Sequence, residues 1–177
     1  MSSKRTADWY ARCLAEPATA HAEWQDHGVA VLPLGARFEA VRIPDAVAYV
    51  ATESAEDRVV DIALALALEG PVIHDSRGRN YYALVEPGAA ERWRARSAVE
   101  CLGYGTHLGV PDMGQDRAAP NRPIYWAATP GPGEYFCRIA AVQLLVRIGA
   151  ARLAEAVQKE HDSAAHSGLV REVTAHG

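Results

Sequence analysis

The segment 72-VIHDSRGRNYYALVEPG-88 decides the fold, because two apolar runs flank one short polar turn. The runs "VIHD" and "NYYALVEP" are rich in residues that are typical of β-strands. This pattern predicts an antiparallel hairpin with Ser76 to Arg79 at its tip. Because the turn carries Arg77 and Arg79, it is a candidate for phosphate binding as well as for an ordinary exposed turn.

The residues before this hairpin predict helices, two strands and further helices. Helices are expected at 6–16 and 17–28, with Pro17 in the first turn of the second helix and Gly28 at its end. The segments 28–34 and 37–43 predict a hairpin around Gly35 and Ala36.

Two more helices are expected at 43–51 and 54–70. Ser54 is the predicted N-cap of the second of these helices, and Gly70 is its predicted terminator. Its continuous run of alanine, leucine and isoleucine at 62–68 predicts a mostly buried helix.

The residues after the central hairpin predict a similar mixture. A short helix is expected at 88–96, and a hairpin of 98–102 and 106–112 is expected to close through the glycines of "GYG". A polar loop leads to a strand at 124–129. A helix is expected from Glu134 to about Lys159, with Gly149 as a possible break.

This order predicts an α+β fold with a largely antiparallel sheet, covered on one side, and helices at both ends of the chain. The expected division is 1–27 for N-terminal helices, 28–130 for the core, 131–160 for a C-terminal helical segment and 161–177 for a flexible tail.

Composition limits the functions that fit the chain. The 177 residues are 49% hydrophobic, and 18 basic against 22 acidic residues give a net charge of -4. This charge provides no global attraction to nucleic acid or to an anionic membrane, so any such binding must use a local basic patch. The cysteines, Cys13, Cys101 and Cys137, are expected to be free thiols in a reducing cytoplasm. The start of the chain has no signal-like apolar core, and no later run has membrane-spanning length.

Four motifs occur in an order that is similar to a known family. They are "HGVAVLPL" at 27–34, "SRGRNYY" at 76–82, "VECLGYGTHLGVPD" at 99–112 and "IYW" at 124–126. Together they resemble the N-terminal catalytic domain of bifunctional DNA primase/polymerases of the archaeo-eukaryotic primase superfamily, especially short actinobacterial relatives. The resemblance covers residue 28 to about 129 and implies a sheet of primase-polymerase type.

The resemblance implies which residues would face a nucleotide or phosphate. The family's Ser-Gly-Gly-x-His turn is matched by five consecutive residues, which are Ser76, Arg77, Gly78, Arg79 and Asn80. Asn80 replaces the histidine, so a group that can be positively charged is replaced by a neutral amide donor. Glu100 stands at the family's third acidic position, and its strand is expected next to the hairpin. Arg77 and Arg79 are expected on the same side of the domain as Asn80 and the "GYGT" turn at 103–106.

The resemblance also implies that the metal site is degenerate. The family's D-x-D carboxylates, which hold divalent metals, fall at about Val41 and Ile43, and neither side chain can ligate magnesium. Glu39 and Asp45 are six residues apart, about 20 Å along a strand, so they cannot share one ion unless the chain bends sharply. We therefore expect no catalytic residue, no metal ligand and no cofactor. Magnesium or manganese is expected only if a relocated set of carboxylates keeps the enzyme active.

Other residue groups have an ordinary structural interpretation beside a functional one. Asp57 and Asp61 share one face of a helix, and a solvated helix start is favoured over metal binding. His74 and His107 are expected in different hairpins, as packed or surface histidines and not as a metal pair. In "ERWRAR", a helix with Trp93 in the core is favoured over a nucleic-acid-stacking surface.

Three functions therefore remain open. The first is an inactive primase-polymerase-like domain that binds nucleotide or nucleic acid through the basic turn, or that serves as an interaction scaffold. The second is an active primase or polymerase with a relocated metal site. The third is a structural protein that contacts a partner through the apolar C-terminal helix at 136–157. No membrane association is expected in any of them.

Overall fold

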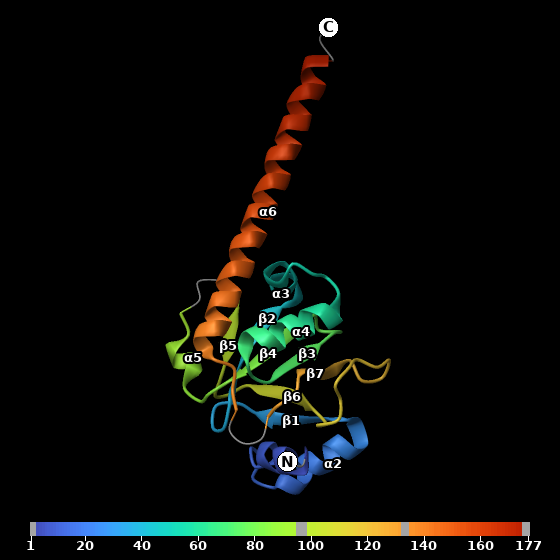
Figure 1. Cartoon of the computed structure of the whole chain (residues 1–177), viewed down its shortest axis with the longest axis vertical. Coiled ribbons are helices and arrows are strands. Elements are labelled where there is room, and N and C mark those ends of the chain that lie inside the picture. The colour runs from blue at the N-terminus through green and yellow to red at the C-terminus, as the bar shows by residue number, and fades with distance from the viewer. Residues whose placement is uncertain (1–2, 95–98, 132–134, 175–177) are drawn as a thin grey trace.

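A computed structural model describes residues 3–94, 99–131 and 135–174 of the chain (Figure 1). In chain order the elements are α1 (Ser3–Ala11), α2 (Pro17–His27), β1 (Val29–Pro33), β2 (Glu39–Pro44), α3 (Asp45–Thr52), α4 (Asp57–Leu68), β3 (Val72–Asp75), β4 (Asn80–Val85), α5 (Ala89–Arg92), β5 (Glu100–Leu102), β6 (His107–Pro111), β7 (Ile124–Ala128) and α6 (Ile139–Thr174). No helix of these residues is long and apolar enough to cross a membrane.

The strands form a five-stranded sheet in the order β5-β2-β4-β3-β7 and a two-stranded sheet of β1 and β6. Each of these strand pairs is antiparallel. The predicted α+β fold with a largely antiparallel sheet and with helices at both ends is therefore confirmed.

The five-stranded sheet is buried on both faces, whereas the sequence predicted a cover on one face. Side chains alternate along a strand, so Tyr81 and Ala83 of β4 enter a core shared with α3, α4 and α6. Tyr82 and Leu84 of the same strand enter a second core, which is shared with α1, α2, β1 and β6. The two layers are visible above and below the sheet in Figure 1.

Two predicted hairpins are wrong. The strands on either side of Gly35 do not pair with each other, because β1 pairs with β6 and β2 pairs with β4 and β5. The strands on either side of "GYG", β5 and β6, likewise belong to different sheets. Both turns carry the chain from one sheet to the other, and they pack together. A Cβ on Gly35 would lie 2.6 Å from the ring of Tyr104, so the close approach requires glycine.

The predicted N-terminal helices are present. Helix α2 begins at Pro17 and ends before Gly28, whose φ of 73° is left-handed.

Helix α4 differs from expectation at both ends. The Ser54 hydroxyl accepts a bond from the N–H of Glu56 before the helix starts at Asp57, so Ser54 is not the N-cap. Glu69 adopts the left-handed conformation after Leu68, one residue before the predicted terminator.

Helix α4 is also less buried than predicted. Val60, Leu64 and Leu68 are buried, but Ile62 and Leu66 are exposed on the opposite side. The apolar run therefore forms a helix with one buried apolar face and one exposed face that is also apolar.

Helix α6 runs without a break through Gly149 and continues to Thr174, where the sequence predicted a flexible tail. It packs against α3 and then extends away from the two layers (Figure 1). A Cβ on Gly149 would lie 2.5 Å from the carbonyl oxygen of Val47, so glycine allows the two helices to touch. One turn further on, Arg152 donates to the carbonyl of Val50 at 2.8 Å and pairs with Glu53 at 2.7 Å. These bonds satisfy the end of α3.

The contact at Gly149 reverses the effect that a helix substitution usually has. In an exposed helix interior, glycine to alanine stabilises by about 1 kcal/mol. At Gly149 the new methyl group would collide with backbone, so we expect Gly149→Ala to lower the free energy of unfolding by about 1–3 kcal/mol in urea titrations. Ala151 is exposed in the same helix, and Ala151→Gly should cost only about 1 kcal/mol. A stabilised Gly149→Ala variant would contradict this packing of α3 on α6.

Candidate functional site

The arginine turn is the tip of a hairpin, as predicted. Strands β3 and β4 pair antiparallel, and Asp75 opposite Asn80 is the last pair before the turn. The expected neighbouring strand is wrong, because β2 separates β4 from the Glu100 strand β5. The "GYGT" turn was expected on the same side as the arginines, but it lies toward the other end of the sheet. It follows Leu102, which pairs with Ala40, whereas Asn80 pairs with Pro44.

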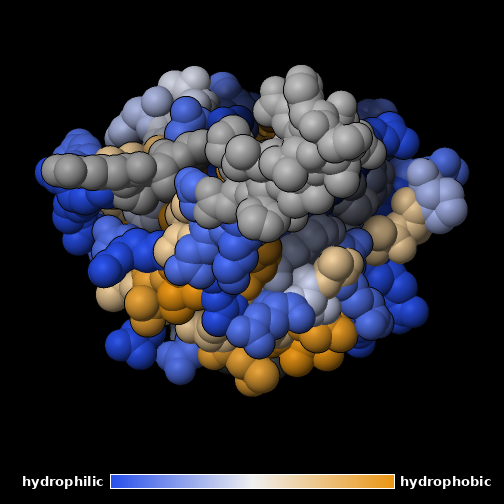
Figure 2. Space-filling view, turned by 90° about the horizontal axis from the view of Figure 1, so that it is seen from above, coloured by the Kyte–Doolittle hydropathy of each residue, from blue (hydrophilic) through white to orange (hydrophobic). Residues whose placement is uncertain are grey.

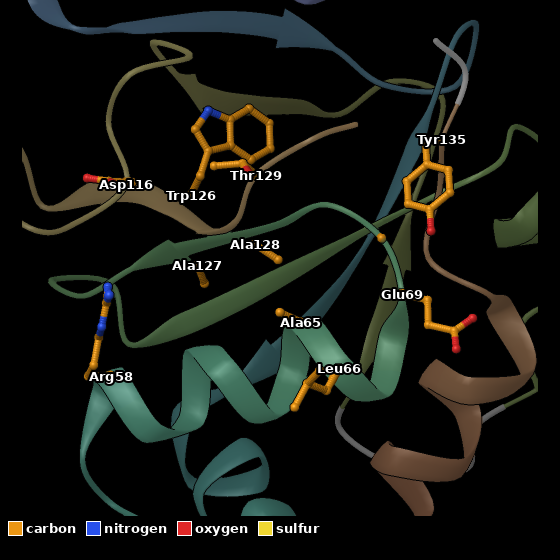
Figure 3. A pocket seen from close by; sticks show the side chains of 11 residues that line it. Arg58, Ala65, Leu66, Glu69, Asp116, Trp126, Ala127, Ala128, Thr129 and Tyr135 are labelled. Atoms are coloured by element: carbon orange, nitrogen blue, oxygen red, sulfur yellow. The ribbon is translucent and has the colours of Figure 1, made fainter. Parts of the chain in front are cut away.

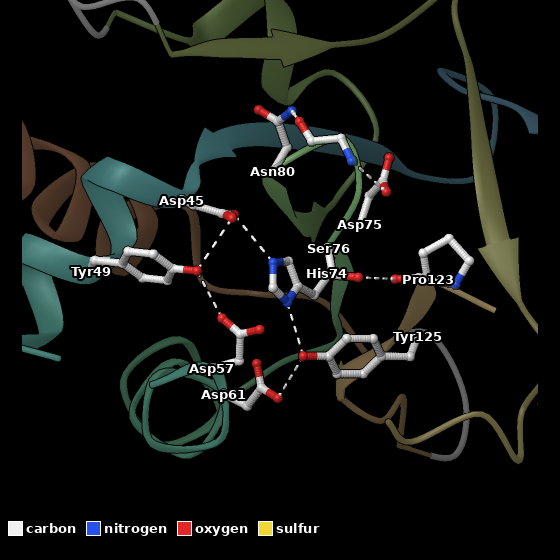
Figure 4. A network of polar contacts seen from close by, with 11 residues as sticks. Asp45, Tyr49, Asp57, Asp61, His74, Asp75, Ser76, Asn80, Pro123 and Tyr125 are labelled. Atoms are coloured by element: carbon white, nitrogen blue, oxygen red, sulfur yellow. Dashed lines mark hydrogen bonds and ion pairs between the residues drawn. The ribbon is translucent and has the colours of Figure 1, made fainter. Parts of the chain in front are cut away.

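Internal hydrogen bonds hold the turn. The Gly78 N–H donates to Asp75 at 2.8 Å, and the Asn80 amide donates to the Gly78 carbonyl at 2.6 Å. The Ser76 hydroxyl donates to the carbonyl of Pro123 at 3.0 Å, as Figure 4 shows. Three of the five predicted ligand-binding residues, Ser76, Gly78 and Asn80, therefore use their polar groups in hydrogen bonds that stabilise the turn.

Arg77 and Arg79 remain outward. Both are exposed, and neither forms an ion pair within the part of the chain that the structure describes. Glu86, an acid near the turn in the sequence, is paired with Arg92 at 2.6 Å. Arg79 has a φ of 57°, and its carbonyl accepts a bond from the N–H of Asp45 at 3.0 Å. A left-handed conformation of a non-glycine residue costs about 1 kcal/mol or more, so the surrounding bonds must hold it.

A cleft of about 310 Å³ lies between the five-stranded sheet and β6. Asp75, Arg42 and Tyr82 line it from the sheet, and His107 of β6 and the preceding residue Thr106 line it from the other side. Burial raises the pKa of the Tyr82 hydroxyl, Asp75 raises it further and Arg42 lowers it. A volume of this size is at the lower end of the range for small-molecule sites. Since Asp75 both lines the cleft and holds the turn, the arginines lie near one end of the cleft.

The positions that the resemblance assigns to metal ligands have other roles. Val41 and Ile43 are fully buried in the core beneath α3, α4 and α6, on the face of the sheet away from the cleft. Glu100 is exposed and pairs with Arg42 at 2.8 Å. Among the described residues, no three or more histidines, cysteines and acids form a group that could hold a metal ion.

Glu39 and Asp45, the acids on either side of the first-motif positions, contact different elements of the fold. Glu39 is buried and accepts a bond from the Ala90 N–H at 2.6 Å. Asp45 is buried beside His74 instead. The two carboxylates therefore have separate partners, the Ala90 N–H of α5 for Glu39 and His74 of β3 for Asp45.

A buried polar network, which the sequence did not predict, joins α3, α4, β3 and β7 (Figure 4). His74 is fully buried, with Nε2 at 3.2 Å from Asp45 and Nδ1 at 2.9 Å from the Tyr125 oxygen. The Tyr125 hydroxyl donates to Asp61 at 3.1 Å. On the other side of Asp45, Tyr49 lies at 3.3 Å and donates to Asp57 at 2.7 Å.

The network corrects the interpretation of Asp57 and Asp61 and bears on that of His74. Asp61 is buried and faces Tyr125, so it is not part of a solvated helix start. Asp57 shares the network through Tyr49. The interpretation of His74 as a packed histidine separate from His107 is confirmed, because His107 is exposed and lines the cleft instead.

The chain of hydrogen bonds from Asp45 through His74 and Tyr125 to Asp61 requires one proton more than a neutral imidazole, one hydroxyl and two ionised carboxylates can supply. Asp45 can only accept from Nε2, and Tyr125 has a single hydroxyl proton, which it gives to Asp61. Nδ1 and the Tyr125 oxygen would then face each other without a proton. The contact between Nδ1 and the Tyr125 oxygen is satisfied if the extra proton is on Nδ1. It is also satisfied if the extra proton is on Asp61 and the hydroxyl proton of Tyr125 points toward His74.

The surroundings favour uptake of a proton by the acids. Burial raises the pKa of Asp61, although Tyr125, His74 and Tyr81 lower it, and the charge of Asp57 raises it again. Burial likewise raises the pKa of Asp45 against the lowering effects of His74 and Tyr49. Among the described residues, one oxygen of Asp61 and the hydroxyl of Tyr81 are buried without a well-aligned hydrogen-bond partner, although Tyr81 lies near enough to lower the pKa of Asp61. Such a site is a poor place for a bare carboxylate.

The remaining candidate residues are structural. Trp93 is half-buried against the helix-side core, and its indole N–H donates to the Val99 carbonyl at 3.0 Å. The packed interpretation of Trp93 is therefore confirmed, although α5 ends at Arg92 and residues 95–98 of the expected helix lie outside the described residues. Cys13, Cys101 and Cys137 are free, as predicted. Burial raises the pKa of Cys101 and Cys137 to about 12.

A second and shallower hollow of about 580 Å³ lies between α4 and β7 (Figure 3). Arg58, Glu69 and Asp116 line it together with the projecting side chains of Leu66 and Tyr135. Its charged groups are of both signs, so it favours no single class of charged ligand.

Comparison with known proteins adds no family assignment, since no family model, curated protein or solved structure matches the chain. The resemblance to primase/polymerases therefore rests on the four sequence motifs.

The network predicts a dependence of stability on pH that Asp61→Asn removes. A carboxyl whose folded-state pKa is raised stabilises the fold fully below its ordinary pKa of 3.8, and this stability is lost as the pH rises through the folded-state pKa. The amide of asparagine imitates the protonated carboxyl and does not titrate. We therefore expect the melting temperature of Asp61→Asn, relative to the unsubstituted protein, to increase as the pH rises above 3.8.

The matched control is Asp116→Asn, because Asp116 is exposed and outside the network. Its melting temperature should follow that of the unsubstituted protein across the same pH range. If Asp61→Asn also does so, Asp61 is ionised in the folded state throughout this pH range and does not hold the extra proton.

Proposed function

We propose that this chain is a primase-polymerase-like domain that binds a phosphate-bearing ligand, nucleotide or single-stranded nucleic acid, without carrying out nucleotidyl transfer. The observation that carries the proposal is the pair of exposed arginines, Arg77 and Arg79, on a turn held by its own hydrogen bonds. Guanidinium groups on a stiff turn lose little conformational freedom when they bind a phosphate. The reducing cytoplasm fits the three free cysteines and remains our proposed location.

The cleft supplies a second part of the proposed site. Tyr82 and His107 can stack on a base, and Arg42 carries a charge, although Glu100 partly neutralises it. A ligand whose phosphates contact the turn could extend into this space from the end at Asp75. Because Asp75 is acidic, the cleft favours the neutral base over a second phosphate.

The inactive form is favoured over the active alternative by the residues near the proposed ligand. Metal-dependent transfer needs carboxylates that converge on one ion beside the triphosphate. On the cleft face Glu100 is paired with Arg42, and the first-motif positions Val41 and Ile43 face the opposite core. Asp45, Asp57 and Asp61 are bonded to tyrosine and histidine beneath the sheet.

Binding to a labelled oligothymidine strand, measured by fluorescence anisotropy at several salt concentrations, tests this proposal. Each phosphate of a single strand that an arginine neutralises contributes about 0.7 to the slope of log affinity against log salt, so two arginines contribute about 1.4. We expect Arg77→Ala/Arg79→Ala to lose the binding, and its melting temperature to change little because exposed turn side chains contribute little to stability.

The control is Arg117→Ala/Arg147→Ala, which removes the same charge at exposed positions outside the turn. It should keep both the affinity and most of the salt slope. Equal binding by the two double variants would leave the turn as an ordinary hairpin. Calorimetric titration of a nucleoside triphosphate, with and without manganese, separates the alternatives, because tight metal-dependent binding with nucleotide incorporation would support the active enzyme.

A further inference from the structure

Helix α4 presents a row of exposed apolar side chains. The exposed fractions are 43% for Val59, 54% for Ile62 and 75% for Leu66, which follow one another at helical spacing. Beside this row, an apolar groove of about 260 Å³ lies between α3, α4 and α6. Leu144 and Ile148 of α6 line it and are themselves 56% and 39% exposed. Figure 2 looks down on α6 and shows hydrophobic surface gathered on the side of the domain that carries α4.

The charges at the two ends of this row are opposite. Arg58 is at the start of α4, and it forms no ion pair among the described residues. Glu69 follows the last residue of α4, and its contact with Arg138 is long, at 3.6 Å between two exposed side chains. At 100° per residue, Arg58, Ile62 and Glu69 lie within about 40° of one another on the helix. Both charges therefore border the same edge of the apolar row, about 17 Å apart.

We propose that this surface binds a second copy of the same chain, with the two α4 helices antiparallel across a two-fold axis near Ile62 and Ala63. This arrangement places Arg58 opposite Glu69 of the partner subunit and Val59 opposite Leu66 of the partner subunit. Ile62 then meets Ile62 of the partner subunit. A two-fold axis that reverses the helix direction keeps the same edge of both helices together, so two reciprocal ion pairs form on that edge.

The charge pattern favours a second copy over an unrelated partner, because the surface is complementary to itself. A parallel two-fold arrangement would place the charged edges of the two helices on opposite sides of the contact, where Arg58 cannot meet Glu69 of the partner subunit, so it gains no reciprocal ion pair and is disfavoured. The apolar row in the centre with charges at its ends matches the usual anatomy of an interface, which has an apolar core and a polar rim. Since α4 has 12 residues, the contact is small and the dimer should be weak and dependent on concentration.

Sedimentation velocity over a wide range of protein concentration tests the proposal. We expect a monomer–dimer equilibrium that Ile62→Glu and Leu66→Glu each weaken at least about tenfold, because an unpaired charge would be buried in the contact. Both side chains are exposed in the monomer, so the variants should fold normally. The matched control is Val31→Glu, since Val31 is 53% exposed on β1, and this variant should dimerise like the unsubstituted protein.

A charge exchange tests the antiparallel geometry itself. Arg58→Glu and Glu69→Arg should each weaken the dimer, because each places like charges opposite one another, and the combined variant should restore it. Recovery in the combined variant cannot result from misfolding of the single variants. A protein that stays monomeric at all concentrations would overturn the proposal, as would a dimer that depends on residues 160–177 and is unchanged by every α4 variant.

Discussion

Burial of both faces of the five-stranded sheet is the constraint on which the rest of this structure depends. Each strand must supply apolar side chains alternately to a core beneath helices and to a core beneath the small sheet. Tyr81 and Tyr82, adjacent in β4, therefore enter different cores. The same alternation sends Val41 and Ile43 toward the helices and leaves Arg42 on the cleft side, where Glu100 pairs with it.

The polar groups that this sheet must accommodate divide into two sets with different properties. On the helix side, His74 and the acids around it are buried, so they satisfy one another through Tyr49 and Tyr125. Such a network connects α3 and α4 to the sheet, and its cost is desolvation. On the turn side, Arg77 and Arg79 are exposed and without ion pairs in the described part of the chain. Of these two sets, only the exposed arginines can contact a ligand without rearrangement of the core.

Several features of the site could be predicted from the sequence because they depend on neighbours in the chain. The hairpin turn follows from glycine and polar residues between two apolar runs, and its exposure follows with it. The buried network could not be predicted, because its members are spread from Asp45 to Tyr125 and none of them forms a local motif. In the sequence, Asp57 and Asp61 also resemble a charged helix start. Only the partners that other elements supply distinguish a solvated helix start from a buried polar network.

By itself, the sequence determined the class of the fold, the central hairpin and the approximate positions of the helices and strands, since alternation, turn residues and helix formers act over a few residues. Tertiary structure alone decided which strands pair. The turns at Gly35 and Gly105 appear as hairpins locally, but they connect separate sheets, because β1 finds its partner in β6. Tertiary structure also decided that Ile62 and Leu66 of the apolar helix α4 face outward. A local pattern records which residues avoid water, whereas the partner that covers them is chosen by contacts between segments far apart in the chain.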